Sequence, residues 1–407
     1  MEVDTKLSEI LTRGVSEIIS YDDLVKLLGT GKPLRLKMGF DPSRPDIHLG
    51  HVVGLRKLRQ FQELGHSVVL IVGDWTAQIG DPSGASITRP MLTAGEVREN
   101  AQTYLSQFFS VVDRDRTEVR WQSEWFGHFD LGQVIWLTSK FTVAQLLARE
   151  DFNQRFKANK PLAVTELLYP LLQAYDSVAV ESDVEFGGSD QKFNLLMGRE
   201  LQDIVGQRPQ QCLLMPILPG TDGVRKMSKS LDNYIAVDDL PTNMYGKVMS
   251  IPDELIQIYF ELLSDRPKRD LDEMVRQMSG QLANPMRFKK LLAHDLTSTF
   301  HGKGAANEAR EAFERVYQRG QSPISTLRVR VPFSKGALTV EESIFRIVVP
   351  QLVQSKAEVK RLLGQGAIKV DGKKITSPEL TVRNGTVVTV GKHGFIEIVL
   401  SEEQRNS

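Results

Sequence analysis

The chain has 407 residues, its 51 basic and 51 acidic side chains balance, and hydrophobic residues make up 41% of it. This length exceeds what one compact core accommodates, so we expect two or three domains with the composition of a globular protein. A single cysteine, Cys212, excludes an internal disulfide and a cysteine-based zinc site. The N-terminal segment is too charged for a signal peptide, and no apolar run approaches membrane-spanning length. These features predict a cytoplasmic protein that makes no membrane contact.

The first predicted unit is a strand, a helix and a second strand. Apolar residues alternate over 34–40, which predicts a strand, and the proline-containing segment 41–46 predicts a turn-rich loop. From Leu49 the apolar residues recur at helical spacing, and the apolar run 67–72 predicts a strand buried on both faces. The motif His48-Leu49-Gly50-His51 therefore lies at a helix N-terminus, where free backbone N–H groups and the helix dipole favour an anion. We also expect Gly50 to let a bulky ligand approach the backbone.

A second motif, Lys226-Met227-Ser228-Lys229-Ser230, follows the turn-forming residues 220–225, which predicts that both lysines are on an exposed loop. Lysine is a compact, flexible point charge that can follow phosphates as they move. Two imidazoles and two ammoniums suit a site that handles the triphosphate of ATP without a Walker loop. Taken singly, each motif also fits a simpler interpretation, namely capping histidines and a solvated run of charge.

A third pattern lies in the predicted helix 165–180. Tyr169, Gln173 and Asp176 stand at i, i+4 and i+7, so they share one face of a largely apolar helix. If this face is buried, the three polar groups need partners, which a bound ligand can supply; otherwise the face meets water. The segment 187–191 (GGSDQ) follows a predicted strand, and its glycines either let a ligand approach the backbone or form a plain turn.

The second half of the chain changes character. Residues 240–318 are predicted to be helix-rich, and 320–336, with scattered Pro, Gly and Ser, is the best candidate for a linker. The tail is predicted to hold a capped helix that ends at Gly364, followed by strands at 367–370, 382–390 and 395–400 and one after the Asp371-Gly372 turn. Because the overall charge is balanced, any RNA contact must come from a local basic patch. The tail has one, made of Lys356, Lys360, Arg361, Lys369, Lys373 and Lys374.

HxGH followed by KMSKS is the double signature of class I aminoacyl-tRNA synthetases. The stretch 38–86 (from MGFDPSRPDIHLGH to GDPSGAS) resembles bacterial tyrosyl-tRNA synthetases, as do 165–177, 184–200 and 226–235. The resemblance extends over essentially the whole chain. It implies an α/β fold: a Rossmann-like parallel-sheet catalytic domain, then an α-helical domain and a small α+β RNA-binding domain.

The resemblance also implies domain boundaries. The nucleotide-binding domain would span 1–235, with a helical insertion at about 90–165, and an α-helical anticodon-side domain would span 236–320. A linker at 321–340 would lead to a small RNA-binding domain of ribosomal-protein type at 341–400.

Site residues follow from the resemblance position by position. Asp176 would receive the phenol hydroxyl of tyrosine, and Tyr169 and Gln173 would hold its amino group. The chain departs from the family pattern at Lys37, where many bacterial members have a second hydroxyl-contacting tyrosine, so we leave Lys37 out of the pocket. The intact KMSKS sequence places the chain nearer the other bacterial branch. The catalytic residues would be His48, His51, Lys226 and Lys229; the ATP-binding residues Asp41, Ser43, His48, Gly50, His51, Gly188, Asp190 and Lys229; and the tyrosine-binding residues Asp81, Tyr169, Gln173, Asp176 and Gln191.

The implied activity is that of a tyrosine–tRNA ligase, with L-tyrosine, ATP and tRNA(Tyr) as substrates. Mg²⁺ would enter with ATP as the substrate complex, with no prosthetic group and no metal site of the protein's own. The resemblance also implies a homodimer, with 131–150 as the candidate interface. Three alternatives fit the sequence less well. A tryptophanyl enzyme has the same motifs, but an indole has no hydroxyl for Asp176. An HxGH nucleotidyltransferase has no need of the tail, and a non-catalytic RNA-binding paralogue has no need of intact motifs.

Overall fold

The computed structural model describes residues 5–43, 46–82, 92–280, 282–315, 327–333, 361–370, 373–375, 386–390 and 394–402. The chain divides into two compact units, Met1–Asn307 and Glu308–Ser407, and each is described by itself.

The first unit is built on a six-stranded sheet in the order β1–β6–β5–β2–β3–β4. All neighbouring strands are parallel except β1, which is antiparallel to β6. The predicted strands at 34–40 and 67–72 are confirmed as β2 and β3. The strand order reverses between β2 and β5, and in such sheets ligands bind in the crevice at the carboxyl ends of the strands at this point. The strands are β1 (Glu17–Ile19), β2 (Arg35–Phe40), β3 (Ser67–Val72), β4 (Thr117–Trp121), β5 (Val184–Gly188) and β6 (Gln211–Met215).

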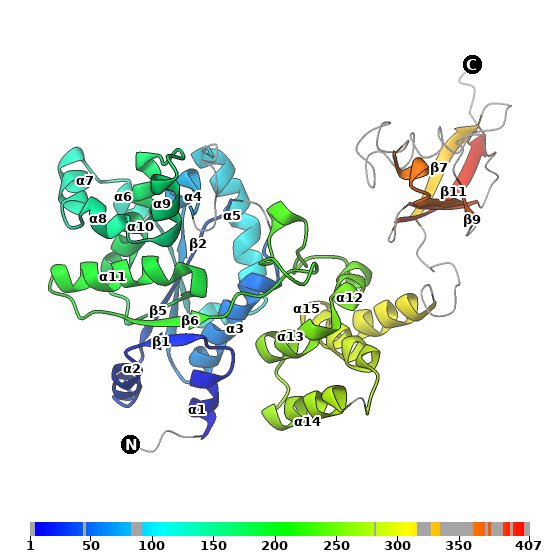
Figure 1. Ribbon diagram of the computed structural model, residues 1–407, viewed down its shortest axis with the longest axis horizontal. Coiled ribbons are helices and arrows are strands. Elements are labelled where there is room, and N and C mark those ends of the chain that lie inside the picture. The colour runs from blue at the N-terminus through cyan, green and yellow to red at the C-terminus, as the bar shows by residue number, and fades with distance from the viewer. Residues whose placement is uncertain are drawn as a thin grey trace. The chain divides into compact units, whose positions relative to one another are not determined.

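Helices cover both faces of this sheet (Figure 1). Successive residues of a strand point to opposite faces. Met38 packs on α3 so closely that a Cβ on Gly54 of this helix would overlap its side chain. The neighbouring residue Lys37 contacts Ser177 of α10 on the other face. The helices up to the end of β6 are α1 (Thr5–Thr12), α2 (Tyr21–Leu28), α3 (Leu49–Glu63), α4 (Thr76–Ile79), α5 (Ala94–Phe108), α6 (Ser123–Phe126), α7 (Leu131–Thr138), α8 (Val143–Leu146), α9 (Glu150–Lys157), α10 (Val164–Ala179) and α11 (Lys192–Ile204).

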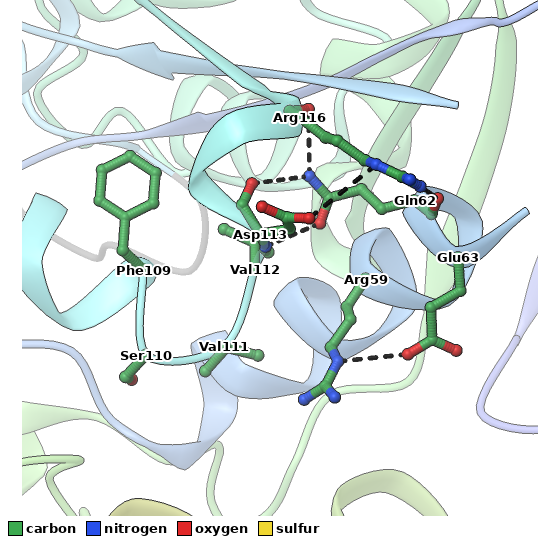
Figure 2. Close-up of a pocket in the computed structure, with 9 residues that line it drawn as sticks. All are labelled: Arg59, Gln62, Glu63, Phe109, Ser110, Val111, Val112, Asp113 and Arg116. Atoms are coloured by element: carbon green, nitrogen blue, oxygen red, sulfur yellow. Dashed lines mark hydrogen bonds and ion pairs between the residues drawn. The ribbon is translucent and has the colours of Figure 1, made fainter. Parts of the chain in front are cut away.

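The predicted helical insertion at about 90–165 needs a correction, because it contains β4, a strand of the main sheet. All five residues of β4 are half-buried, so the strand lacks the apolar run that marks its neighbour β3. Gln62 of α3 anchors the segment before it: its amide donates to the carbonyls of Asp113 and Arg116 and accepts from the Asp113 N–H (Figure 2).

The predicted helix-rich stretch after residue 240 is confirmed by α12 (Pro241–Ser250), α13 (Ile256–Leu263), α14 (Lys268–Ser279) and α15 (Pro285–Phe313). These helices belong to the first unit up to Asn307. Arg13 joins them to the N-terminal part, because its guanidinium donates to the carbonyls of Ser264 at 2.8 Å and Arg266 at 2.6 Å. The boundary between a catalytic domain ending at 235 and a helical domain starting at 236 stays a prediction.

The second unit holds a five-stranded sheet in the order β7–β11–β10–β8–β9. Residues 361–364 are helical, and Leu363, Ile368, Val370 and Val388 are buried. The predicted linker at 321–340 needs a correction: Leu327–Phe333 forms β7, which pairs in parallel with β11. The partner strand β11 lies much later in the sequence than β7. Pro332 lies within β7, and a proline inside a segment argues against predicting a strand there. The other strands are β8 (Ile368–Val370), β9 (Lys373–Lys374), β10 (Val387–Val390) and β11 (Gly394–Glu402).

Candidate active site

The HLGH histidines cap α3. His48 is the N-cap residue, and its Nδ1 accepts from the Gly50 N–H at 3.2 Å, while Nδ1 of His51 accepts from the His48 N–H at 3.2 Å. Burial, helped by Lys229, lowers the pKa of His51 to about 4, and burial, helped by His51 and the two lysines of the second motif, lowers the pKa of His48 well below its ordinary value. Both rings are therefore neutral at pH 7. Because each Nδ1 is an acceptor, the hydrogen-bond pattern assigns the ring proton to Nε2, which leaves two N–H donors for an anion.

Gly50 is required by the protein itself. A Cβ at this position would lie 2.9 Å from the His48 ring and 3.7 Å from Cβ of Met227. His48 and the second motif occupy the space that a side chain at position 50 would need, and the expected approach of a ligand to the Gly50 backbone stays a prediction. Met227 is buried, and the Leu49 N–H donates at 3.0 Å to the carbonyl of Ile235, which follows the second motif. This part of the chain therefore packs against the HLGH end of α3.

The two lysines of the second motif differ in their surroundings. The Lys226 side chain is 45% exposed, and its Nζ lies 3.2 Å from Oδ2 of Asp190. The Lys229 side chain is only 9% exposed; it donates to the Asp46 carbonyl, and its Nζ is 3.5 Å from the Asp46 carboxylate. The prediction of two exposed lysines is thus wrong for Lys229, because the loop folds back over the HLGH end of α3. Both positive charges are brought to this helix end.

Asp176 is 2% exposed inside the face of α10 that the sequence pattern predicted. Its two oxygens accept from Nε2 of Gln122 at 2.8 Å and from Nε1 of Trp125 at 3.2 Å. Burial raises the pKa of Asp176 to about 7, although Lys37 and these two hydrogen bonds oppose the shift. No motif pointed to Gln122 or Trp125, since they reach Asp176 only through the folding of the chain after β4.

Tyr169 is also buried, and its hydroxyl donates to Oδ2 of Asp41 at 2.8 Å. Burial and the neighbouring carboxylates raise the pKa of Tyr169 well above its ordinary value, so the hydroxyl keeps its proton. Oδ1 of Asp41 accepts from Oγ1 of Thr76 at 2.7 Å, and the Thr76 N–H donates to Oε1 of Gln122 at 2.9 Å. A continuous chain of hydrogen bonds therefore connects Asp41, predicted to bind ATP, with Asp176, predicted to bind tyrosine.

The other residues predicted to bind the substrate tyrosine lie close to α11. Nε2 of Gln173 donates to Oε1 of Glu185 at 3.1 Å, and Nε2 of Gln191 donates to Oδ2 of Asp81 at 2.7 Å. Lys37, left out of the predicted pocket, is fully buried next to these groups and pairs with Glu185. The structure therefore brings all five predicted tyrosine-binding residues into one polar cluster and adds Lys37 and Glu185 to it.

The predicted ATP-binding residues gather at the carboxyl ends of β2 and β5. Gly188 ends β5, and a Cβ there would lie 2.6 Å from Oδ1 of Asp190, so a glycine is needed for that carboxylate to fold back. Ser43 is exposed, and its N–H donates to the Asp41 carbonyl at 2.7 Å. A separate pocket of about 350 Å³ near the C-terminal end of α3 contains none of the predicted site residues (Figure 2).

Four of the six predicted RNA-binding residues lie in the described part of the second unit, and Lys356 and Lys360 lie outside it. Arg361, Lys369, Lys373 and Lys374 are all exposed. Lys369 and Lys374 are directly opposite each other in the antiparallel pair of β8 and β9. Like charges in such positions destabilise a sheet, and an anion between them removes that cost.

Within the described residues, no helix has both the length and the apolar character to cross a membrane, and no group of three or more His, Cys, Asp or Glu side chains is arranged to hold a metal ion.

A parallel sheet with its switch point beside a histidine-capped helix and a lysine loop defines a class I synthetase core. The family model for "tRNA synthetases class I (W and Y)" matches residues 30–318, and the S4 domain model matches 348–388. The chain belongs to this family of class I tRNA synthetases. It is 56% identical to the tyrosine–tRNA ligase of Dehalococcoides mccartyi (strain ATCC BAA-2266), over 98% of this chain and 100% of that one. It is 48% identical to the tyrosine–tRNA ligase of Thermotoga maritima, over 98% of each chain.

Solved structures share the fold. A C-terminally truncated mitochondrial tyrosyl-tRNA synthetase from Aspergillus nidulans matches with a TM-score of 0.63 at 19% identity, over 77% of this chain and 93% of that one. The tyrosyl-tRNA synthetase from Archaeoglobus fulgidus, complexed with L-tyrosine, matches with a TM-score of 0.61 at 24% identity, over 74% of this chain and 98% of that one.

Proposed function

We propose that this chain is a tyrosine–tRNA ligase that activates L-tyrosine with ATP and transfers it to tRNA(Tyr). The observation that carries the proposal is Asp176, a buried carboxylate whose two oxygens are held by Gln122 and Trp125. A carboxylate oxygen can accept more than one hydrogen bond, so Asp176 can also accept from a phenol hydroxyl. A site built in this way rejects phenylalanine, because the further acceptor position that Asp176 offers to the hydroxyl would then stay unfilled.

The other end of tyrosine would lie toward Tyr169, Gln173 and Asp81. Because Tyr169 donates its hydroxyl proton to Asp41, its oxygen is left to accept from the tyrosine ammonium. Gln191 lies beside Asp81 and would meet the carboxyl end of tyrosine. In this orientation the tyrosine carboxylate faces the residues at the ends of β2 and β5 that would bind ATP.

In the first step, an oxygen of the tyrosine carboxylate attacks the α-phosphorus of ATP, and the bond to the β-phosphate breaks to release pyrophosphate. Mg²⁺ accompanies ATP as part of the substrate. The chain contributes position and charge: His48 and His51 donate from neutral Nε2–H groups, and Lys226 and Lys229 bring positive charge to the phosphates. Asp190 would accept from the adenosine ribose, and Asp41, Ser43, Gly50 and Gly188 would line the nucleotide.

In the second step, a hydroxyl at the tRNA 3′ end attacks the carbonyl carbon of tyrosyl-adenylate, and AMP leaves. We place contacts with the tRNA phosphates in the second unit, where Arg361, Lys369, Lys373 and Lys374 are exposed. Lys356 and Lys360 would add to this patch. The reaction takes place in the cytoplasm, where tRNA and ATP are found.

The chain would act as a homodimer through its α7–α8 region. Leu131, Ile135 and Val143 are 73%, 59% and 63% exposed, and Val134 and Trp136 add to the same apolar surface. An apolar surface of this kind is typical of a protein interface. Sedimentation of the wild type and of Ile135→Asp tests this part: a dimer that dissociates in the variant is expected, and a monomeric wild type would contradict it.

The test of the activity is ATP–pyrophosphate exchange with tyrosine, phenylalanine and tryptophan, followed by charging of tRNA. We expect exchange that depends on tyrosine, with phenylalanine disfavoured by several orders of magnitude; selectivity of about 10⁵ is already known for tyrosyl-tRNA synthetases as a class. Exchange that depends on tryptophan would favour the tryptophanyl alternative, and exchange without tRNA charging would favour a nucleotidyltransferase.

A further inference from the structure

Asn194, in the first turn of α11, lies within the polar cluster of predicted tyrosine-binding residues. Asn194 is only 1% exposed. Nδ2 donates to Oε1 of Gln173 at 3.0 Å and to Oε1 of Gln191 at 2.9 Å, so both amide hydrogens are used on two predicted tyrosine-binding residues. No motif singled out Asn194.

Charged groups fix the direction of each amide in this cluster. Glu185 accepts from Nε2 of Gln173, and Asp81 accepts from Nε2 of Gln191. With the NH₂ group of each glutamine on a carboxylate, the oxygen of each must face the other way, toward Asn194. A carbonyl oxygen has two lone pairs, so the Gln173 oxygen can accept a second hydrogen bond beside the one from Asn194.

Arg149 fixes the direction of Asn194 itself. Its guanidinium is 6% exposed, Nη1 donates to Oδ1 of Asn194 at 3.2 Å, and Nη2 lies 3.8 Å from Oδ1 of Asp81. Nε of Arg149 donates to Asp151 at 2.8 Å, which holds the arginine in place. A closed ring therefore runs from Asp81 through Gln191, Asn194 and Arg149 back to Asp81.

We propose that Asn194, oriented by Arg149, is a positioning residue for the amino end of tyrosine: it holds the amide oxygen of Gln173 so that this oxygen accepts from the tyrosine ammonium. This inference rests on the proposed roles of Gln173, Gln191 and Asp81. Asn194 acts through other side chains, so its loss should affect tyrosine binding selectively. The phenol contact of Asp176 and the phosphate contacts lie outside the ring.

Asn194→Asp tests this role, because it keeps the size of the side chain and the acceptor for Arg149 but removes both donors. We expect the KM for tyrosine to rise at least tenfold, the KM for ATP to change less than twofold, and the tyrosine-to-phenylalanine preference to stay within threefold of wild type. Inhibition by 3-(4-hydroxyphenyl)propionate, which lacks the amino group, should weaken much less than tyrosine binding does. Should this variant not fold, Asn194→Ser, which keeps one hydroxyl donor, gives the same comparison with a smaller rise.

The matched control is Gln62→Leu, which removes another buried, fully hydrogen-bonded amide at the far end of α3 (Figure 2). It should lower the melting temperature without changing the KM for tyrosine. Asp81→Ala distinguishes the inference from the site assignment on which it rests. If Asp81→Ala raises the KM for tyrosine and a folded Asn194→Asp does not, the role of Asn194 is overturned. If Asp81→Ala also has no effect, the assigned amino-group site is wrong, and the inference fails with it.

Discussion

Lys37 and Glu185 form an ion pair in the interior of the first unit, with Nζ 3.0 Å from Oε1 and the two side chains 0% and 1% exposed. They are direct neighbours in the parallel register of β2 and β5, the two strands between which the strand order reverses. Lys37 also donates to the Gln173 carbonyl at 3.0 Å and to Oγ of Ser177 at 2.8 Å. The pair therefore joins the centre of the sheet to α10, the helix that carries Tyr169, Gln173 and Asp176.

Removing one partner of this pair should cost more than removing both. Lys37→Met leaves the Glu185 carboxylate buried without its counter-charge, which typically destabilises a protein by about 3–5 kcal/mol. The double variant Lys37→Met/Glu185→Gln should recover a large part of that loss, because no uncompensated charge remains. Denaturant unfolding of the two single variants and the double variant measures the coupling. Purely additive effects would mean that the two side chains do not depend on each other.

Asp176→Asn should damage recognition of the phenol hydroxyl. Asp176 offers an oxygen to each of two donors, Gln122 and Trp125, whereas an asparagine has one oxygen and must turn its NH₂ toward one of them. We expect the tyrosine-to-phenylalanine preference in pyrophosphate exchange to shrink at least tenfold, or about 1.4 kcal/mol. Phenylalanine activation should change less than tyrosine activation. An unchanged preference would move the specificity role elsewhere, with Lys37 as the first candidate.

The raised pKa of Asp176, about 7 and caused mainly by burial, predicts a pH dependence of tyrosine binding. The carboxylate form is the stronger acceptor for a phenol, so the KM for tyrosine should fall as the pH rises from about 6 to 8. In the ligand-free protein the sign for stability is opposite. The folded state binds the proton that the unfolded state has already lost, so stability should decrease as the pH rises from the ordinary carboxyl pKa toward 7. Both trends should flatten in Asp176→Asn; trends that persist there would belong to another group.

Lys229→Ala should cripple adenylate formation and leave tyrosine binding nearly intact. Lys229 is held at Asp46 beside the HLGH end of α3, whereas Asp176 is held by Gln122 and Trp125. Loss of one donor to a developing charge typically costs on the order of 10²–10³ in rate. Single-turnover adenylate formation and equilibrium dialysis with tyrosine measure the two quantities. A variant that forms adenylate at the wild-type rate would show that Lys229 has no role at the phosphates.

Truncation after Arg315, ahead of β7, should separate the two half-reactions. A cut after Gly336 would leave β7 behind, although it pairs with β11 of the second unit. Adenylate formation should persist, because all residues predicted to bind tyrosine or ATP precede the cut. Affinity for tRNA should fall, and its dependence on salt should become less steep, since phosphate contacts release counterions. Filter binding across a salt series decides it, and equal slopes in the two chains would exclude the tail as an RNA contact.

Local patterns in the sequence determined β2, α3, β3 and α10, because each has a hydrophobic period that its own residues specify. They also determined the two motifs and the shared face of Tyr169, Gln173 and Asp176. Family membership follows from such ordered, local information.

The partners of those residues were decided by tertiary structure alone. Gln122 and Trp125 reach Asp176 across separations of 54 and 51 residues along the chain, and Asn194 joins Gln173 across 21. No period in the sequence records which buried amide meets which carboxylate. β7 likewise becomes a strand through its pairing with β11, close to the other end of its unit. Hydrophobic periodicity fixes which face of an element is buried, whereas the hydrogen bonds inside that face depend on which other elements fold against it.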